Sequence, residues 1–249
     1  MRRQKFRRLD DLKAKLESHL PLPSESQRSL REDQILRWTY NSNAIEGNTL
    51  SLMETKVVLE GITIGGKSLQ EHFEAINHRE AILYVEDLAK QRKLLAEIDI
   101  KSIHHLVLKN IDEINAGAYR KVNVRISGAS HIPPDFLDVP FLMEEFIGWY
   151  KKEHTHMHPV ELAARVHADF VKIHPFVDGN GRTSRLLMNL ELLKAGFPAA
   201  ILPVEKRLTY YQSLEMAHIQ NNYEPFFDLM SSIVEESFKP YWSLLGEKE

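Results

Sequence analysis

The chain has 249 residues, 43% of them hydrophobic and 27% charged, which is enough for one large globular domain or two small ones. A net charge of −3 gives no general attraction to nucleic acid or anionic membranes, and no segment reaches the ~20 apolar residues of a membrane span. The absence of cysteine excludes disulfides and thiolate chemistry but says little about location. The charged start is unlike a signal peptide, and for this reason we expect a cytoplasmic protein.

The N-terminal region, residues 1–95, is predicted to be helical because its apolar residues recur at helical spacing. The first helix ends before Pro21, and residues 24–26 are interpreted as a polar link. The helices predicted for this region cover about 9–20, 29–47, 52–60 and 69–88.

The end of the second predicted helix carries a polar pair. Ser42 and Glu46 stand one turn apart on the same helical face, and Gly47 is a stop signal. Taken alone, this spacing is equally typical of a surface glutamate at a helix end. Its functional interpretation therefore depends on a motif farther along the chain.

The region 96–200 begins with a predicted helix over 98–108. Residues 122–126 then alternate between apolar and polar, and turn residues follow them. We therefore predict a small β-hairpin, which is too small to be stable alone and must rest on the helices. Another helix is predicted over 141–150.

Three histidines follow that helix, at positions 154, 156 and 158. Imidazoles attract zinc or nickel. Because no cysteine or suitably spaced acid completes such a site, we predict a loop here.

The stretch from His174 to Arg185 reads HPFVDGNGRTSR and lies between two predicted helices. The first helix covers 159–173, and the second continues to about Gly196. The two glycines around Asn180 allow successive main-chain N–H groups to point into one hollow at a helix N-terminus. Such a hollow binds anions, and phosphate above all.

Ionisable side chains accompany this hollow. Arg182 and Arg185 lie where the helix macrodipole disfavours cations by a few tenths to ~1 kcal/mol, and a bound polyanion would remove that conflict. Asp178 could hold Mg²⁺ against phosphates, and His174 supplies a base tunable to neutral pH. Each residue also has an ordinary explanation as a cap, a turn, a solvated cation or a helix end. Those explanations do not account for the arginines and the paired glycines together.

The C-terminal region, residues 201–249, is predicted to add helices that pack on the core. The last of these is an amphipathic helix over about 226–245. The chain shows no internal repeat and no DNA-binding helix-turn-helix.

The stretch 174–185 resembles the signature of the Fic family, H-P-F-x-[D/E]-G-N-G-R-x-x-R, and matches it at every fixed position. The resemblance covers most of residues 100–200, including the Gly117 to Arg120 element before the hairpin. It implies a mainly α-helical Fic fold, a helical bundle with a small β-hairpin flap over the active site. It also implies a protein adenylyltransferase, which transfers AMP from ATP to a hydroxyl of a target protein.

The resemblance implies roles for individual residues. His174 would be the catalytic base toward a Ser, Thr or Tyr hydroxyl, Asp178 would be the Mg²⁺ ligand, and Arg185 would orient the γ-phosphate. The other residues expected to bind ATP belong to the signature, to the hairpin turn and to a later helix: Gly179, Asn180, Gly181, Arg182, Thr183, Ser184, Ile126, Ser127, Gly128, Tyr210, Tyr211 and His218.

Beside this signature, the segment from Ser42 to Gly47 resembles the family's N-terminal inhibitory motif, [S/T]-x-x-x-E-[G/N]. The resemblance implies that Glu46 pairs with Arg185 and obstructs a productive γ-phosphate position. A carboxylate is a natural occupant of an empty anion site. The hairpin resembles the family's flap, whose edge can align a target segment near His174.

Three other functions remain open. Glu46 could activate water to remove AMP from a modified target, the pocket could bind nucleotide in a catalytically silent scaffold, or His and Asp residues could form a zinc or nickel enzyme. The expected partners are ATP and a protein target with a hydroxyl side chain, and whether the chain is its own target is left open. A homo-oligomer is also open, whereas neither nucleic acid nor a membrane is expected.

Overall fold

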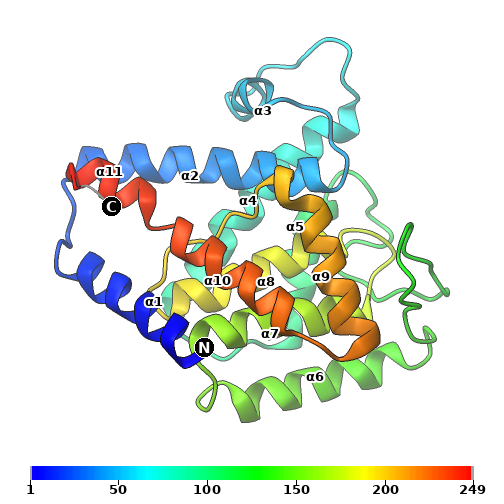
Figure 1. Ribbon diagram of the computed structural model, residues 1–249. Helices are drawn as coiled ribbons and strands as arrows, with labels where there is room; N and C mark the ends of the chain where they lie inside the picture. The colour runs from blue at the N-terminus through cyan, green and yellow to red at the C-terminus, as the bar shows by residue number, and fades with distance from the viewer. Residues whose placement is uncertain (1, 248–249) are drawn as a thin grey trace.

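The computed structural model describes residues 2–247, and within that range the chain is built from helices and connecting loops, with no strand (Figure 1). No helix among these residues is both long enough and apolar enough to cross a membrane. The helices are α1 (Arg2–Glu17), α2 (Ser24–Ile45), α3 (Leu52–Leu59), α4 (Leu69–Gln91), α5 (Glu97–Leu108), α6 (Val139–Glu153), α7 (Pro159–Ile173), α8 (Asn180–Lys194), α9 (Arg207–Gln220), α10 (Glu224–Glu236) and α11 (Lys239–Leu245), with one 3₁₀ turn, η1 (Val204–Lys206).

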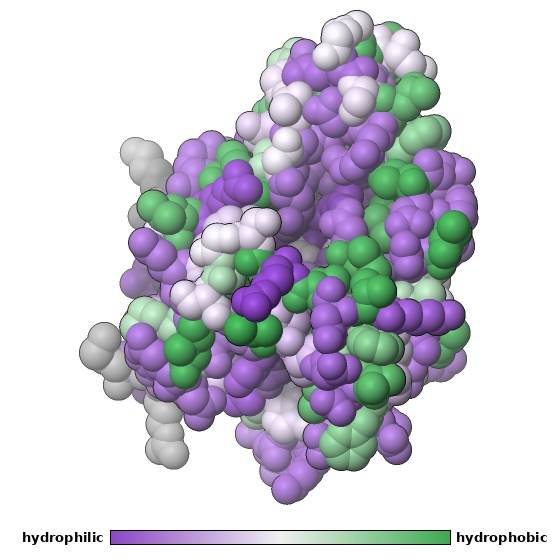
Figure 2. Space-filling model, turned by 90° about the vertical axis from the view of Figure 1, so that its right-hand side faces the viewer, coloured by the Kyte–Doolittle hydropathy of each residue, from purple (hydrophilic) through white to green (hydrophobic). Residues whose placement is uncertain are grey.

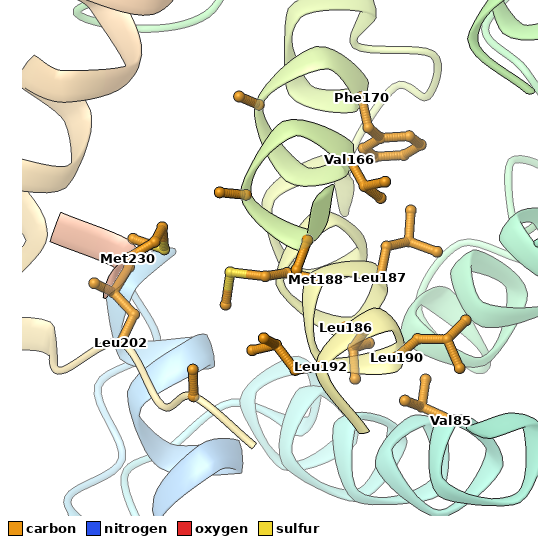
Figure 3. Packing of buried hydrophobic residues seen from close by; sticks show 14 of the residues in the cluster. Val85, Val166, Phe170, Leu186, Leu187, Met188, Leu190, Leu192, Leu202 and Met230 are labelled. Carbon is orange, nitrogen blue, oxygen red and sulfur yellow. The ribbon is translucent and has the colours of Figure 1, made fainter. Parts of the chain in front are cut away.

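Helix α8 lies at the centre of the molecule and packs against α7, α4, α5 and the end of α2. Its side chains are buried around most of its circumference, and the buried set includes the polar residues of its first turns. Figure 3 shows Val166 and Phe170 of α7 beside Leu187 of α8, and Leu190 of α8 near Val85 of α4. All of these side chains are buried in one cluster that spans the described chain from α1 to α11. The first turn of α8 is therefore held on a rigid support.

Helix α2 starts earlier than predicted. Residues 24–26, interpreted above as a polar link, are its first turn, because Pro23 ends the preceding loop with an extended backbone and Glu25 complements the helix dipole. The buried Trp38 and Ile45 fix this helix against the body of the protein. Its C-terminal end consequently reaches α8.

The helices predicted over 52–60 and 69–88 are confirmed as α3 and α4. Each begins with a reciprocal capping box, formed by Ser51 with Glu54 and by Ser68 with Glu71. Figure 1 shows that α3 and its loops project from the helical body.

The single C-terminal helix predicted over 226–245 is wrong, because two helices, α10 and α11, occupy this range. Pro240 has no N–H to donate, and its ring obstructs the carbonyl one turn earlier. Proline therefore stands in the first turn of α11, and α10 ends at Glu236.

Residues 120–135, which we call the flap, contain no strand, so the predicted β-hairpin is not found among the described residues. The turn does form, since a main-chain bond of 3.2 Å closes residues 126–129. Prolines at 133 and 134 have no N–H for a ladder. Side-chain bonds, among them those of Asn123, link the two arms instead.

Candidate active site

His174 occupies the C-cap of α7, where its backbone is left-handed (φ 52°, ψ 58°) and its N–H donates to the Phe170 carbonyl at 3.1 Å. This turn directs the chain away from α7 and toward α8. Burial lowers the pKa of His174 to about 4. The imidazole is therefore neutral at pH 7, which is the form that accepts a proton.

The loop from α7 to α8 is held in shape from within. Both polar atoms of the Asn180 amide bond to the Phe176 main chain, at 3.0 and 2.9 Å. Gly179 adopts φ 75°, a conformation that side chains disfavour, and α8 begins immediately after it. The N–H groups of this first turn have no acceptor inside the helix, so the loop presents them as an anion site.

His104 supports this loop from α5. Its Nδ1 accepts the Gly117 N–H at 2.9 Å, so the proton lies on Nε2, which donates to the Asp178 carbonyl at 2.8 Å. The ring stacks on Phe176 with centroids 3.5 Å apart. Sequence reasoning did not assign this supporting role, because the spacing of His104 is that of an ordinary buried helix residue.

Two buried guanidinium groups lie behind the first turn of α8. Arg182 donates to the Asp178 carboxylate at 3.0 Å and lies 3.6 Å from a Glu74 oxygen. Among the described residues, Nε and Nη1 of Arg182 and Nη1 of Arg185 have no hydrogen-bond partner. Unpaired buried donors cost free energy, which an anion bound there would recover.

Glu46 and Ser42 meet Arg185 at the end of α2. Arg185 donates through Nη2 to Glu46 Oε1 at 2.7 Å and to the Ser42 carbonyl at 2.8 Å, and through Nε to Ser42 Oγ at 3.0 Å. A side chain at Gly181 would overlap the Glu46 carboxylate, so the carboxylate lies directly against the first turn of α8. Gly47, with φ 101°, ends α2 just after it. The Ser42–Glu46 pair is thus joined at the anion site to Arg185, which is 139 residues after Glu46 in the sequence.

Three of the residues expected to bind ATP have side chains in the protein interior. Thr183 and Ser184 are fully buried on the core side of α8, and Ser184 Oγ donates to the Gly181 carbonyl at 2.8 Å. Tyr210 is also buried, and its hydroxyl bonds to His167 at 3.0 Å. Their hydroxyls are therefore buried, and the predicted part of these residues in binding ATP stays a prediction.

The other predicted nucleotide contacts lie between the flap and α9. Residues 126–128 form the flap turn, and the ring of His218 lies 5.0 Å from that of the flap residue His131. The flap is fixed to α9 by Glu215, which accepts the Ser130 N–H at 2.7 Å. Tyr211, half exposed, donates its hydroxyl to the Ile45 carbonyl at 3.1 Å and so ties α9 to the end of α2.

The histidines at 154, 156 and 158 lie in the predicted loop. Nδ1 of His158 accepts the Val160 N–H and caps α7. Among residues 2–247 no three His, Asp or Glu side chains come close enough to hold a metal ion. Asp178, whose side chain is 61% exposed beside the anion site, is a carboxylate that could supply one metal ligand.

Comparisons with known proteins agree with this geometry. A model of the Fic/DOC family matches residues 94–192. The protein adenylyltransferase Fic of Drosophila melanogaster is 38% identical over 94% of this chain, which covers 48% of that protein. The chain thus spans about half the length of the curated relatives it matches.

Solved structures are similar over the whole fold. Fic-1 (residues 134–508) from C. elegans is 34% identical, with a TM-score of 0.89 over 98% of this chain and 72% of that one. A Fic domain containing signaling protein from Bacteroides thetaiotaomicron is 28% identical, with a TM-score of 0.89 over 96% and 97% of the two chains.

Proposed function

The chain belongs to the Fic/DOC family, and we propose that it is a self-inhibited protein adenylyltransferase that moves AMP from ATP to a Ser, Thr or Tyr hydroxyl of a protein. One observation carries this proposal: a neutral His174, the N-terminus of α8 and two arginines with unpaired donors, Arg182 and Arg185, belong to the same site. The name of the Drosophila relatives supports the same reaction.

In the proposed reaction, the target hydroxyl oxygen attacks the α-phosphorus of ATP while the His174 imidazole takes the hydroxyl proton. The bond from the α-phosphorus to the leaving pyrophosphate then breaks, and AMP remains as an ester on the target. Main-chain N–H groups at the start of α8, with Arg182, stabilise the charge that develops on the phosphate oxygens. Such fixed donors need no reorganisation during the reaction.

Asp178 fits a role as the protein ligand of Mg²⁺, because it is an exposed carboxylate next to the phosphate site. One or two carboxylates complete Mg²⁺ coordination when phosphate oxygens and water supply the rest. When bound, the ion neutralises phosphate charge.

Glu46 supplies the proposed inhibition. Its carboxylate occupies the space against Gly181 and holds Arg185 in a charge-assisted bond. A triphosphate that needs the same arginine must displace the carboxylate first. Withdrawal of Glu46 would also free space beside the unpaired Nη1 of Arg185.

The flap offers a docking site for the target protein. Main-chain groups of residues 123–126 take no part in a strand pair within the described chain, so an extended target segment can pair with them. Figure 2 views the molecule from the flap side and shows hydrophobic side chains gathered among hydrophilic ones. The exposed apolar residues in and next to the flap are Val122, Ile132, Leu137 and Phe141.

Transfer of AMP is tested with ATP labelled at either end. With the label on the α-phosphate, we expect Glu46→Gly protein to become labelled itself or to label proteins of a lysate, and pyrophosphate to be released. With the label on the γ-phosphate, protein should stay unlabelled. Label from the γ-position would indicate phosphate transfer, and nucleotide binding without either label would indicate a silent scaffold.

Arg182→Ala is expected to weaken ATP binding about ten- to a hundredfold, because a charge-assisted bond to phosphate contributes ~1.5–3 kcal/mol. Calorimetry in the presence of Mg²⁺ measures this, with Glu46→Gly as the common background. Arg79→Ala is the matched control, since Arg79 is an exposed arginine of α4 that bonds to the Leu59 carbonyl. Equal ATP affinity in the Arg182 variant would contradict its phosphate role.

A further inference from the structure

Arg120 is a buried arginine at the base of the flap, and its side chain bonds to three separate main-chain carbonyls. Nε donates to the His174 carbonyl at 2.9 Å, Nη1 to Val122 at 3.0 Å and Nη2 to Pro134 at 2.6 Å. Its own N–H donates to the Pro175 carbonyl at 2.9 Å. Arg120 is only 2% exposed. One side chain therefore touches both arms of the flap and the residue assigned as the base.

The environment of this guanidinium is unusual for a buried charge. Within residues 2–247, no carboxylate forms an ion pair with it; burial lowers its pKa, and the charge of Asp135 only partly offsets this. A buried cation is costly unless its hydrogen bonds are satisfied, and here main-chain carbonyls satisfy them. The planar fork of arginine suits this task, because its donors have fixed directions, whereas a lysine ammonium is a single point.

The bonds matter because both partners lie outside regular helices and strands. His174 has a left-handed backbone, which costs a residue with a side chain ~1–2 kcal/mol, so its orientation must be imposed by its neighbours. The flap has no ladder of strand bonds to fix the distance between its arms. Arg120 restrains both at once.

We propose that Arg120 is a positioning residue. It fixes the position of His174 relative to the flap, so that the hydroxyl of a target docked on the flap lies within reach of the His174 imidazole. This inference rests on the proposed function. Arg120 touches neither the nucleotide site nor the reacting atoms, so it acts through His174 and the flap. A displacement of about 1 Å between two reacting groups can lower a rate about a hundredfold.

The charge of Arg120 has a separate, smaller effect. Burial is the main cause of the low pKa of His174, and the positive charge of Arg120 lowers it further. Three other groups act on this imidazole: a hydrogen bond to the Val171 main chain and the charge of Glu46 raise its pKa, and His131 lowers it. Removal of the guanidinium should therefore raise the pKa of His174.

The test compares Arg120→Met and Arg120→Lys in the Glu46→Gly background, with Arg79→Met as control. At pH 8, where His174 is neutral in every variant, we expect kcat for AMP transfer to fall about a hundredfold in Arg120→Met and the ATP affinity to stay within about twofold. Arg120→Lys should lose part of this rate, because one ammonium cannot bond to three carbonyls. The control should match its parent.

The pH profile separates positioning from a general loss of structure. The acidic limb of kcat should move to higher pH in Arg120→Met and stay in place in Arg120→Lys, which keeps the positive charge. An unchanged kcat, full activity in Arg120→Lys, or a loss of ATP affinity equal to the loss of kcat would overturn the proposal. If Arg120→Met does not fold, as judged by circular dichroism, Arg120→Lys alone decides. A Glu46→Gly parent without AMP transfer would refute the proposed function instead.

Discussion

His174→Ala is expected to abolish AMP transfer and to leave ATP binding nearly unchanged. The imidazole acts on the proton of the incoming hydroxyl, whereas the nucleotide is held by the first turn of α8 and the arginines. Loss of a general base lowers a rate by ~10²–10⁴-fold. Transfer from α-labelled ATP measures the rate, and calorimetry measures the affinity, both in the Glu46→Gly background.

The control for this variant is His156→Ala, which replaces an exposed histidine in the turn between α6 and α7. It should transfer AMP at the parental rate. Near-normal turnover in His174→Ala would show that His174 is not the general base. A loss of ATP binding that parallels the loss of rate would show that His174 binds the nucleotide instead.

The pH dependence of kcat/KM offers a second check on His174. A base must be unprotonated to act, and burial lowers the pKa of His174 to about 4. Activity lost through protonation of His174 should therefore appear only as the pH falls toward that pKa, and kcat/KM should be constant from neutral pH down to about 5. An acidic limb near 6.5 would show that the imidazole titrates like an exposed histidine.

Glu46→Gly is expected to increase self-modification with α-labelled ATP by about ten- to a hundredfold. The variant removes the carboxylate that lies against Gly181 and bonds to Arg185 at 2.7 Å. A competing charge-assisted contact contributes ~1.5–3 kcal/mol, and its loss raises the productive occupancy by that factor. Ser42 still holds the Arg185 side chain, so the arginine stays in place for the γ-phosphate.

Two further variants test whether this gain in activity comes from the loss of the Glu46–Arg185 contact. Glu25→Gly places the same substitution at an exposed glutamate in the first turn of α2, and it should leave activity unchanged. Adding Arg185→Ala to Glu46→Gly should cancel much of the gain, because the arginine serves both the inhibited and the active state. Unchanged activity in Glu46→Gly would show that α2 is not the inhibitor. Loss of AMP removal in that variant would favour the reverse reaction as the main task.

The features that the sequence by itself determined are those with local causes. Residues 174–185 contain a helix end, a glycine turn and a helix start. Each of these features is determined by residues close to it in the sequence. The periods of α4, α5 and α7 likewise predict those helices. Base, turn and arginines could therefore be placed together before any tertiary contact was known.

Only the tertiary structure shows which face of each helix is buried in the core and which lines the candidate site. Helical spacing puts Thr183 and Ser184 next to Arg182, but packing against the core buries their hydroxyls. Glu46 and Arg185 lie 139 residues apart, so no local pattern brings them together, and only the resemblance suggested their pairing.

The conformation of the flap and the role of His104 likewise could not be predicted from local sequence patterns. Alternating residues predict a hairpin, yet side chains bond to main-chain groups of the flap, and Arg120 takes the carbonyls of Val122 and Pro134. His104 resembles any buried helix residue until the fold places it under Asp178. Local sequence spacing determines which residues lie on the same helix or turn. Long-range packing determines which side chains from different helices line the same site.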